Sequence, residues 1–157
     1  MRSISKIVCA IDLSPQSDLV ADYAITMATA LNAELVAIYV APEFGEYMSV
    51  EIMPESVSKL TAEVHASAQE TMTKFFDKTF SGVKAQMNVL TGYPSTEIVE
   101  FATKECADLI VMGTHGHQGL SRILFGSVAE GVVKNAPMPV MTIRPQAEAH
   151  TAACAEK

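Results

Sequence analysis

The chain contains five short apolar runs, and this pattern constrains its fold more than any other feature. The runs are rich in Val, Ile and Leu and span residues 7–11, 35–40, 83–90, 109–112 and 140–143. Four of them are nearly continuous, which is typical of strands covered on both faces, as in a parallel sheet. The run at 83–90 alternates apolar and polar residues, so it predicts an edge or half-covered strand.

Helical periodicity fills the gaps between these runs. Ser14-Pro15 predicts the N-cap and first turn of one helix, and Asn32 predicts its left-handed end. Further helices are expected over Glu55–Phe80, from Gly92-Tyr93-Pro94 onward, and over Ser127–Ala136. Strands that alternate with helices predict an α/β fold, in which a doubly wound parallel sheet carries helices on both faces.

The helical stripes also predict which side chains face the core. In the first helix Tyr23 and Leu31 share a face with Val20, and in the last helix Val133 joins Val132. All five are expected to be buried because helix positions three or four apart lie on one face.

The composition favours one globular domain. The chain has 157 residues, of which 49% are hydrophobic and 18% charged. The net charge of −7 argues against nucleic acid and anionic membrane as partners, since both attract basic surfaces. The N-terminus lacks a signal-peptide core and no run reaches the ~20 residues of a membrane span, so we expect a soluble, cytoplasmic protein.

The three cysteines do not form a recognisable site. Cys9, Cys106 and Cys154 fit no metal or redox spacing, so we expect free thiols in a reducing compartment. Cys9 and Cys106 lie within apolar stretches and are expected to be small core residues.

The segment after the fourth apolar run carries the most chemical information. Gly113, Gly116 and Gly119 recur at the carboxyl end of a predicted strand, and Gly126-Ser127 precedes the last helix. Glycine lets a backbone approach a ligand closely, and free N–H groups at a helix start bind phosphate. Residues 109–129 contain no Asp or Glu, so an anion would be accepted there. The Walker and dinucleotide-binding glycine motifs are both absent.

The spacing Gly-x2-Gly-x9-Gly-Ser over residues 113–127 resembles the ATP-binding motif of the universal stress protein family. The resemblance extends to residues 8–14, which look like the family's first strand ending in Asp12. It also extends to Gly92-Tyr93-Pro94, which looks like the entry to its third helix. Residues 136–140 (Ala-Pro-Met-Pro-Val) resemble its closing strand, with Met138 where Cys is more common. The resemblance covers about residues 4–145, and residues 146–157 are expected to be a disordered tail.

The resemblance implies a five-stranded parallel sheet in the order 3-2-1-4-5, an adenine nucleotide α-hydrolase-like, Rossmann-type sandwich. Ligands of such sheets bind beyond the carboxyl ends of the strands, where the order reverses. It further implies that Asp12 lies near the ribose and a phosphate-bound Mg²⁺, and that the Val40 backbone addresses adenine. The ribose would contact Met112 and Gly113, and the phosphates Gly116, Gly126, Ser127 and Val128, with His115 and Arg122 nearby.

Several of these residues have a simpler interpretation. Asp12 can be a turn residue before Ser14, and Ser127 with Glu130 forms a capping-box pattern that needs no ligand. His115 and His117 are solvated loop histidines or a metal pair that lacks a third ligand. Arg122 can be an ordinary surface residue. The apolar side chains of residues 41–54 either pack over the sheet edge or form a lid or partner surface.

Three functions fit the sequence. The preferred one is an ATP-binding signalling or stress-response module; the others are a slow ATP-hydrolysing enzyme and an interaction protein that has lost its nucleotide. The glycines argue against the last. His115 is the sole candidate base, and a catalytic Lys is not evident, so we expect at most weak ATPase activity. The apolar last strand and the resemblance predict a homodimer that pairs through residues 140–143.

Overall fold

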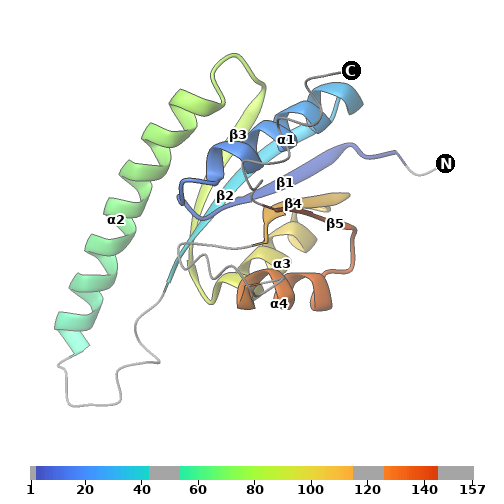
Figure 1. Ribbon diagram of the computed structural model, residues 1–157. Helices are drawn as coiled ribbons and strands as arrows, with labels where there is room; N and C mark the ends of the chain where they lie inside the picture. The colour runs from blue at the N-terminus through green and yellow to red at the C-terminus, as the bar shows by residue number, and fades with distance from the viewer. Residues whose placement is uncertain (1–2, 43–53, 115–125, 145–157) are drawn as a thin grey trace.

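The structure of the protein is a computed structural model that describes residues 3–42, 54–114 and 126–144. The expected tail at 146–157 and residues 43–53 of the apolar loop lie outside this part. Strands and helices alternate along the chain, as the sequence predicts (Figure 1). The strands are β1 (Lys6–Ile11), β2 (Glu34–Pro42), β3 (Ala85–Gly92), β4 (Leu109–Gly113) and β5 (Val140–Ile143). The helices are α1 (Ser17–Leu31), α2 (Pro54–Thr79), α3 (Pro94–Lys104) and α4 (Ser127–Asn135).

The strands form one sheet in the order β3-β2-β1-β4-β5, and each neighbouring pair is parallel. This confirms the expected topology. The alternating strand, β3, lies at an edge of the sheet, also as predicted. Chain order reverses between β1 and β4, so the switch point of the sheet lies between these two central strands.

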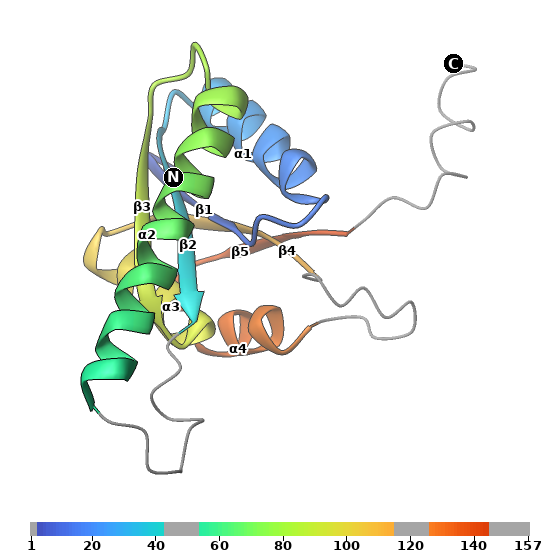
Figure 2. The same ribbon diagram turned by 90° about the vertical axis from the view of Figure 1, so that its left-hand side faces the viewer.

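Two apolar cores explain the continuous runs, because alternate residues of a strand point to opposite faces. Ile7, Cys9 and Ile11 of β1 face α1 and α2, whereas Val8 faces α3 and α4. Figure 2 shows the two helix pairs on opposite sides of the sheet. Small residues form the buried stripe of α1: Ser17, Ala21, Ala24 and Ala28, together with Val20.

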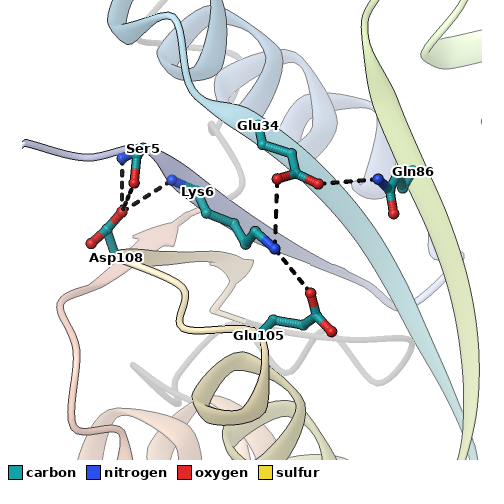
Figure 3. Close-up of polar contacts among 6 residues, drawn as sticks. All are labelled: Ser5, Lys6, Glu34, Gln86, Glu105 and Asp108. Atoms are coloured by element: carbon teal, nitrogen blue, oxygen red, sulfur yellow. Dashed lines mark hydrogen bonds and ion pairs between the residues drawn. The ribbon is translucent and has the colours of Figure 1, made fainter.

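Polar side chains bond one another at the amino edge of the sheet (Figure 3). One carboxylate oxygen of Asp108, which precedes β4, accepts hydrogen bonds from the Ser5 amide (2.7 Å), the Ser5 hydroxyl (2.8 Å) and the Lys6 amide (3.0 Å). The Lys6 ammonium lies 3.0 Å from Glu105 and 3.5 Å from Glu34. We call Ser5, Lys6, Glu34, Gln86, Glu105 and Asp108 the amino-edge cluster.

Four side-chain predictions are wrong. Tyr23 and Leu31 of α1 and Val133 of α4 are exposed, because the helices approach the sheet along a narrower stripe of smaller residues. Cys106 is also exposed, since it occupies the left-handed position (φ 53°) that follows α3. Cys9 is fully buried, and burial raises the pKa of its thiol to about 12. In the described residues no helix is long and apolar enough to cross a bilayer.

Candidate functional site

The carboxyl ends of β1, β2 and β4 bring several predicted site residues together. Ile11 pairs with Tyr39, and Ala10 pairs with Met112. Continuing this register by one or two residues places Asp12 level with Val40 on one side and with Thr114 on the other. Asp12 and the Met112-Gly113 strand end therefore flank the switch point between β1 and β4, and Val40 lies one strand away, on β2.

Asp12 organises the turn between β1 and α1. Its Oδ1 accepts a hydrogen bond from the Ser14 amide at 3.0 Å and another from the Ser17 hydroxyl at 2.8 Å. Leu13, between them, has a left-handed backbone (φ 59°), which is uncommon for a bulky residue. The turn interpretation of Asp12 is thus correct, and it leaves a ligand role untested.

The first helix begins later than the sequence suggests. The Ser17 amide donates to the Ser14 carbonyl at 3.0 Å, which closes a separate turn, and α1 starts at Ser17 with Gln16 as its N-cap. Ser14 is therefore not the N-cap, although its hydroxyl accepts a 3.3 Å hydrogen bond from the Gln16 amide.

The junction between β4 and α4 is closed by backbone hydrogen bonds. The Thr114 amide donates to the Ile143 carbonyl at 2.9 Å, and the Gly126 amide donates to the Thr114 carbonyl at 2.8 Å. Gly126 is the N-cap of α4 with an extended backbone (φ −71°, ψ 161°), and no side chain caps it. The capping-box interpretation of Ser127 is wrong, because Ser127 is the first helical residue. The start of α4 is therefore held beside the end of β4.

The two residues that follow Gly126 differ in exposure. The Ser127 side chain is exposed and is available to a ligand. Val128 packs against the core beneath α3 and α4, so it can contribute only its backbone amide. The N-terminus of α4 also carries the positive end of the helix dipole. This combination of amides, hydroxyl and dipole can accept a phosphate group.

At the carboxyl ends of β1 and β2, Asp12 influences the surroundings of Tyr39. Burial, and after it the negative charge of Asp12, raises the pKa of Tyr39 above the usual value for a phenol. The Asp12 carboxylate therefore lies close enough to β2 to affect the pKa of Tyr39. Among the described residues, no group of three His, Cys, Asp or Glu is suited to a metal ion.

The structure leaves three predicted site residues undescribed. His115, Gly116 and Arg122 lie in the segment 115–125, outside the described ranges. Sequence reasoning also missed two residues. Ser17 anchors Asp12, and its position five residues later, in the first turn of a helix, was a usable signal. The Thr114 carbonyl accepts the hydrogen bond from the Gly126 amide, and the identity of the Thr114 side chain does not predict this bond.

Comparison with known proteins settles the family. Residues 3–144 match the universal stress protein family over nearly the whole chain. The chain belongs to this family. Universal stress protein MJ0531 of Methanocaldococcus jannaschii is 44% identical over 142 residues, which cover 88% of this chain and 81% of that protein.

Solved structures of universal stress proteins share the fold. The structure of protein MJ0577 of the same organism superposes with a TM-score of 0.80 at 28% identity, covering 94% of this chain and all of that one. Two more distant structures hold a nucleotide. One universal stress protein is in complex with cAMP (TM-score 0.60, 21% identity, 92% of this chain and 100% of that one). Another, from Archaeoglobus fulgidus, is in complex with dAMP (0.54, 23%, 91% and 99%).

Proposed function

We propose that this universal stress protein binds an adenine nucleotide, ATP with Mg²⁺, at the carboxyl edge between β1 and β4, and acts as a nucleotide-dependent signalling module in a stress response. The observation that carries the proposal is the start of α4. Gly126 stands at the N-cap with no capping side chain, and its hydrogen bond to Thr114 holds the helix beside β4. Backbone amides at such a helix start favour phosphate.

Each site residue has a role under this proposal. The phosphates lie against the amides of Gly126, Ser127 and Val128, and the Ser127 hydroxyl adds a donor. Met112 and Gly113 flank the ribose, and the Val40 backbone recognises adenine. The undescribed residues His115, Gly116 and Arg122 belong to the same segment of the motif and complete the phosphate side.

Under this proposal Asp12 would lie near the ribose and the phosphate-bound cation. A bound Mg²⁺ supplies positive charge that neutralises the phosphates. The residues fit such a group only weakly by themselves, because the described part of the chain offers no metal cluster. The cation therefore enters with the nucleotide.

Other members of the fold support the choice of an adenine base. The two structural neighbours with cAMP and dAMP share the fold, and both ligands contain adenine. Their identity to this chain is 21% and 23%, so they support a fold able to hold adenine nucleotides. The choice of ATP over AMP or a cyclic nucleotide comes from the resemblance of residues 113–127 to the ATP-binding motif.

Mass spectrometry of nucleotide released from the purified protein tests the proposal directly, and adenine nucleotide is the expected result. Calorimetry should then give tighter binding for MgATP than for MgGTP. Absence of heat at millimolar MgATP contradicts the proposal and favours an interaction protein. Phosphate release should be far slower than the ~10 s⁻¹ median of enzymes. An ordinary ATPase rate would instead favour the enzyme, with His115 as its base.

A homodimer that pairs through β5 is the second part of the proposal. In the described residues β5 pairs only with β4, yet Val140–Ile143 is apolar. The carbonyls of Pro139 and Ile143 bond to β4. Because alternate residues of a strand direct their backbone groups to opposite sides, Val140 and Thr142 face the open edge. A second copy, antiparallel about a twofold axis, would use those groups.

Two proline substitutions separate this dimer from simple unfolding. Thr142→Pro removes an outward amide, so it should give a folded monomer in analytical ultracentrifugation. Met141→Pro removes an amide that faces β4, so it should destabilise the sheet itself. A wild-type monomer at micromolar concentration refutes the dimer, and a dimeric Thr142→Pro places the interface elsewhere.

A further inference from the structure

Helices α3 and α4 touch at a position where only glycine fits. A Cβ atom added to Gly131, in the middle of α4, would lie 2.8 Å from the Cβ and 2.9 Å from the Oγ of Ser95 in α3. Carbon atoms without a bond between them prefer separations near 3.5–4.0 Å. Because glycine weakens a helix interior by up to ~1 kcal/mol relative to alanine, its presence here has a packing reason.

Ser95 has little freedom to withdraw from this contact. The atom that approaches Gly131 most closely is its Cβ, which is bonded directly to the backbone and does not move with the side-chain rotamer. The turn that carries Ser95 is closed by hydrogen bonds of 3.0 Å from the Thr96 and Glu97 amides to the Tyr93 carbonyl. A larger residue at 131 would therefore displace backbone on one side or the other.

The start of α3 is itself fixed by a second glycine. Gly92 ends β3 with φ 146°, a conformation that other residues rarely adopt. A Cβ there would lie 2.6–2.9 Å from the Glu97 side chain, which covers this glycine. The end of β3, the first turn of α3 and the middle of α4 are thus in close contact one after another, so a larger residue at 131 would press α4 away from α3.

Movement of α4 would reach the candidate phosphate site. Gly131 is four residues, about one turn, from Ser127. Ala129 and Val132, on either side of Gly131, are buried, so a displacement at Gly131 would strain the packing of the neighbouring turns of this nine-residue helix. Its first turn would shift relative to Thr114, to which Gly126 is bonded at 2.8 Å.

We infer that Gly131 and Ser95 are positioning residues: their close contact sets the placement of the first turn of α4 and thereby the affinity for the nucleotide phosphates. The effect on nucleotide affinity rests on the proposed function, whereas the effect on the placement of α4 rests on packing alone. Neither residue contacts the ligand. Residue 131 has to lack a side chain, because the Cβ and Oγ atoms of Ser95 occupy the space that a Cβ would take.

The test is a set of four proteins: wild type, Gly131→Ala, the double variant Gly131→Ala with Ser95→Gly, and Gly82→Ala. Gly131→Ala should weaken MgATP binding on the order of tenfold. Ser95→Gly removes both atoms that the new methyl group meets, so the double variant should recover most of the affinity. Gly82 is the control because its φ is 79° and no atom lies within 4 Å of an added Cβ. Gly82→Ala should lower the melting temperature with unchanged affinity.

Amide chemical shifts of Ser127, Val128 and Ala129 in the nucleotide-free proteins provide a readout independent of ligand. They should move in Gly131→Ala and return in the double variant. If the wild type binds no adenine nucleotide, the proposed function fails and these shifts alone decide the packing inference. An unchanged affinity or unchanged shifts in a folded Gly131→Ala protein overturn the inference, as does a loss that Ser95→Gly fails to reverse.

Discussion

The polar groups at the two edges of the sheet, where the strands begin and where they end, are bonded in different ways. At the amino edge, side chains of the amino-edge cluster bond one another and the backbone, with Asp108 alone accepting three hydrogen bonds (Figure 3). At the carboxyl edge, the junction of β4 and α4 is made by backbone groups, and the helix start has a glycine N-cap. In the first arrangement the polar side chains bond within the protein, and in the second the first amides of α4 have no capping side chain.

From this difference we expect that substitutions at the two edges affect folding stability and nucleotide binding separately. A charged residue at the amino edge should affect folding and leave binding unchanged. A residue near Gly126 should affect binding and leave folding nearly unchanged. Asp12 lies at the carboxyl edge, but its carboxylate accepts hydrogen bonds from Ser14 and Ser17, as Asp108 does from its neighbours at the amino edge. Substitutions at these positions test the contrast.

Gly126→Val should have the largest effect. Its extended backbone suits a β-branched residue, so the fold should survive, while the side chain occupies the phosphate approach. We expect MgATP affinity to fall more than about 100-fold, or about 2.7 kcal/mol, in calorimetry. Far-UV circular dichroism should be unchanged, and Gly126→Ala should give an intermediate loss. Wild-type affinity in a folded Gly126→Val protein would remove the start of α4 from the site.

Asp12→Ala should affect both properties. Two hydrogen bonds to a carboxylate are lost, so the free energy of unfolding should fall by about 2 kcal/mol in denaturant titrations. Nucleotide affinity should fall as well, more in the presence of Mg²⁺ than in its absence. Asp12→Asn keeps an acceptor and should recover stability without recovering the magnesium effect. If both variants bind MgATP normally, Asp12 is a turn residue and nothing more.

Asp108→Asn should lower stability without altering affinity. Hydrogen bonds from Ser5 and Lys6 lower the pKa of Asp108 in the folded state below its ordinary value of 3.8. The ionised carboxylate therefore stabilises the fold above that value, and the stabilisation is lost as the pH falls through the lowered pKa. Acid unfolding of Asp108→Asn should lack this component.

Glu70→Gln is the matched control for Asp108→Asn. The Lys74 hydrogen bond also lowers the pKa of Glu70, but this i,i+4 pair is largely exposed on α2. Solvent screens such pairs, so its acid profile should stay close to wild type. Equal acid profiles for both variants would show that the amino-edge cluster contributes no more than a surface ion pair.

Among the substitutions at the start of α4, Ser127→Ala should have the smallest effect on affinity. The hydroxyl is one donor among several amides, so its loss should weaken MgATP binding about fivefold, which corresponds to ~1 kcal/mol. Melting temperature should not change, because Gly126 and not Ser127 is the N-cap. A loss as large as that of Gly126→Val would show that the hydroxyl, and not the amides, dominates phosphate binding.

Much of the fold was predictable because hydrophobic periodicity reports burial. The continuous runs predicted strands covered on both faces, and the alternation of residues 83–90 predicted the edge position of β3. Asn32 was predicted to end α1 in the left-handed conformation, and it does so with φ 51°. These features depend on local sequence, or on a face that the whole element shares.

Other features depend on neighbours distant in sequence, and the sequence did not predict them. Tyr23, Leu31 and Val133 fall on helical stripes, yet the helices approach the sheet on smaller residues. Cys106 lies beside apolar residues but occupies a turn. The strand end, Asp12, Val40 and the start of α4 lie together as expected, whereas the Gly131–Ser95 contact required three-dimensional packing. The ligand role of every site residue remains a prediction.

The hydrogen bond between Gly126 and Thr114 has a consequence for how this protein can change. It joins the two ends of the segment 115–125 at a single point of the scaffold. What lies between those ends can then be lengthened, shortened or rewritten, while the strand and the helix keep their places. The entropic cost of closing a chain segment rises only slowly with its length, so a change in length there should alter the free energy of unfolding little. We therefore expect that the number and identity of the residues between Thr114 and Gly126 can vary at little cost to the stability of the core.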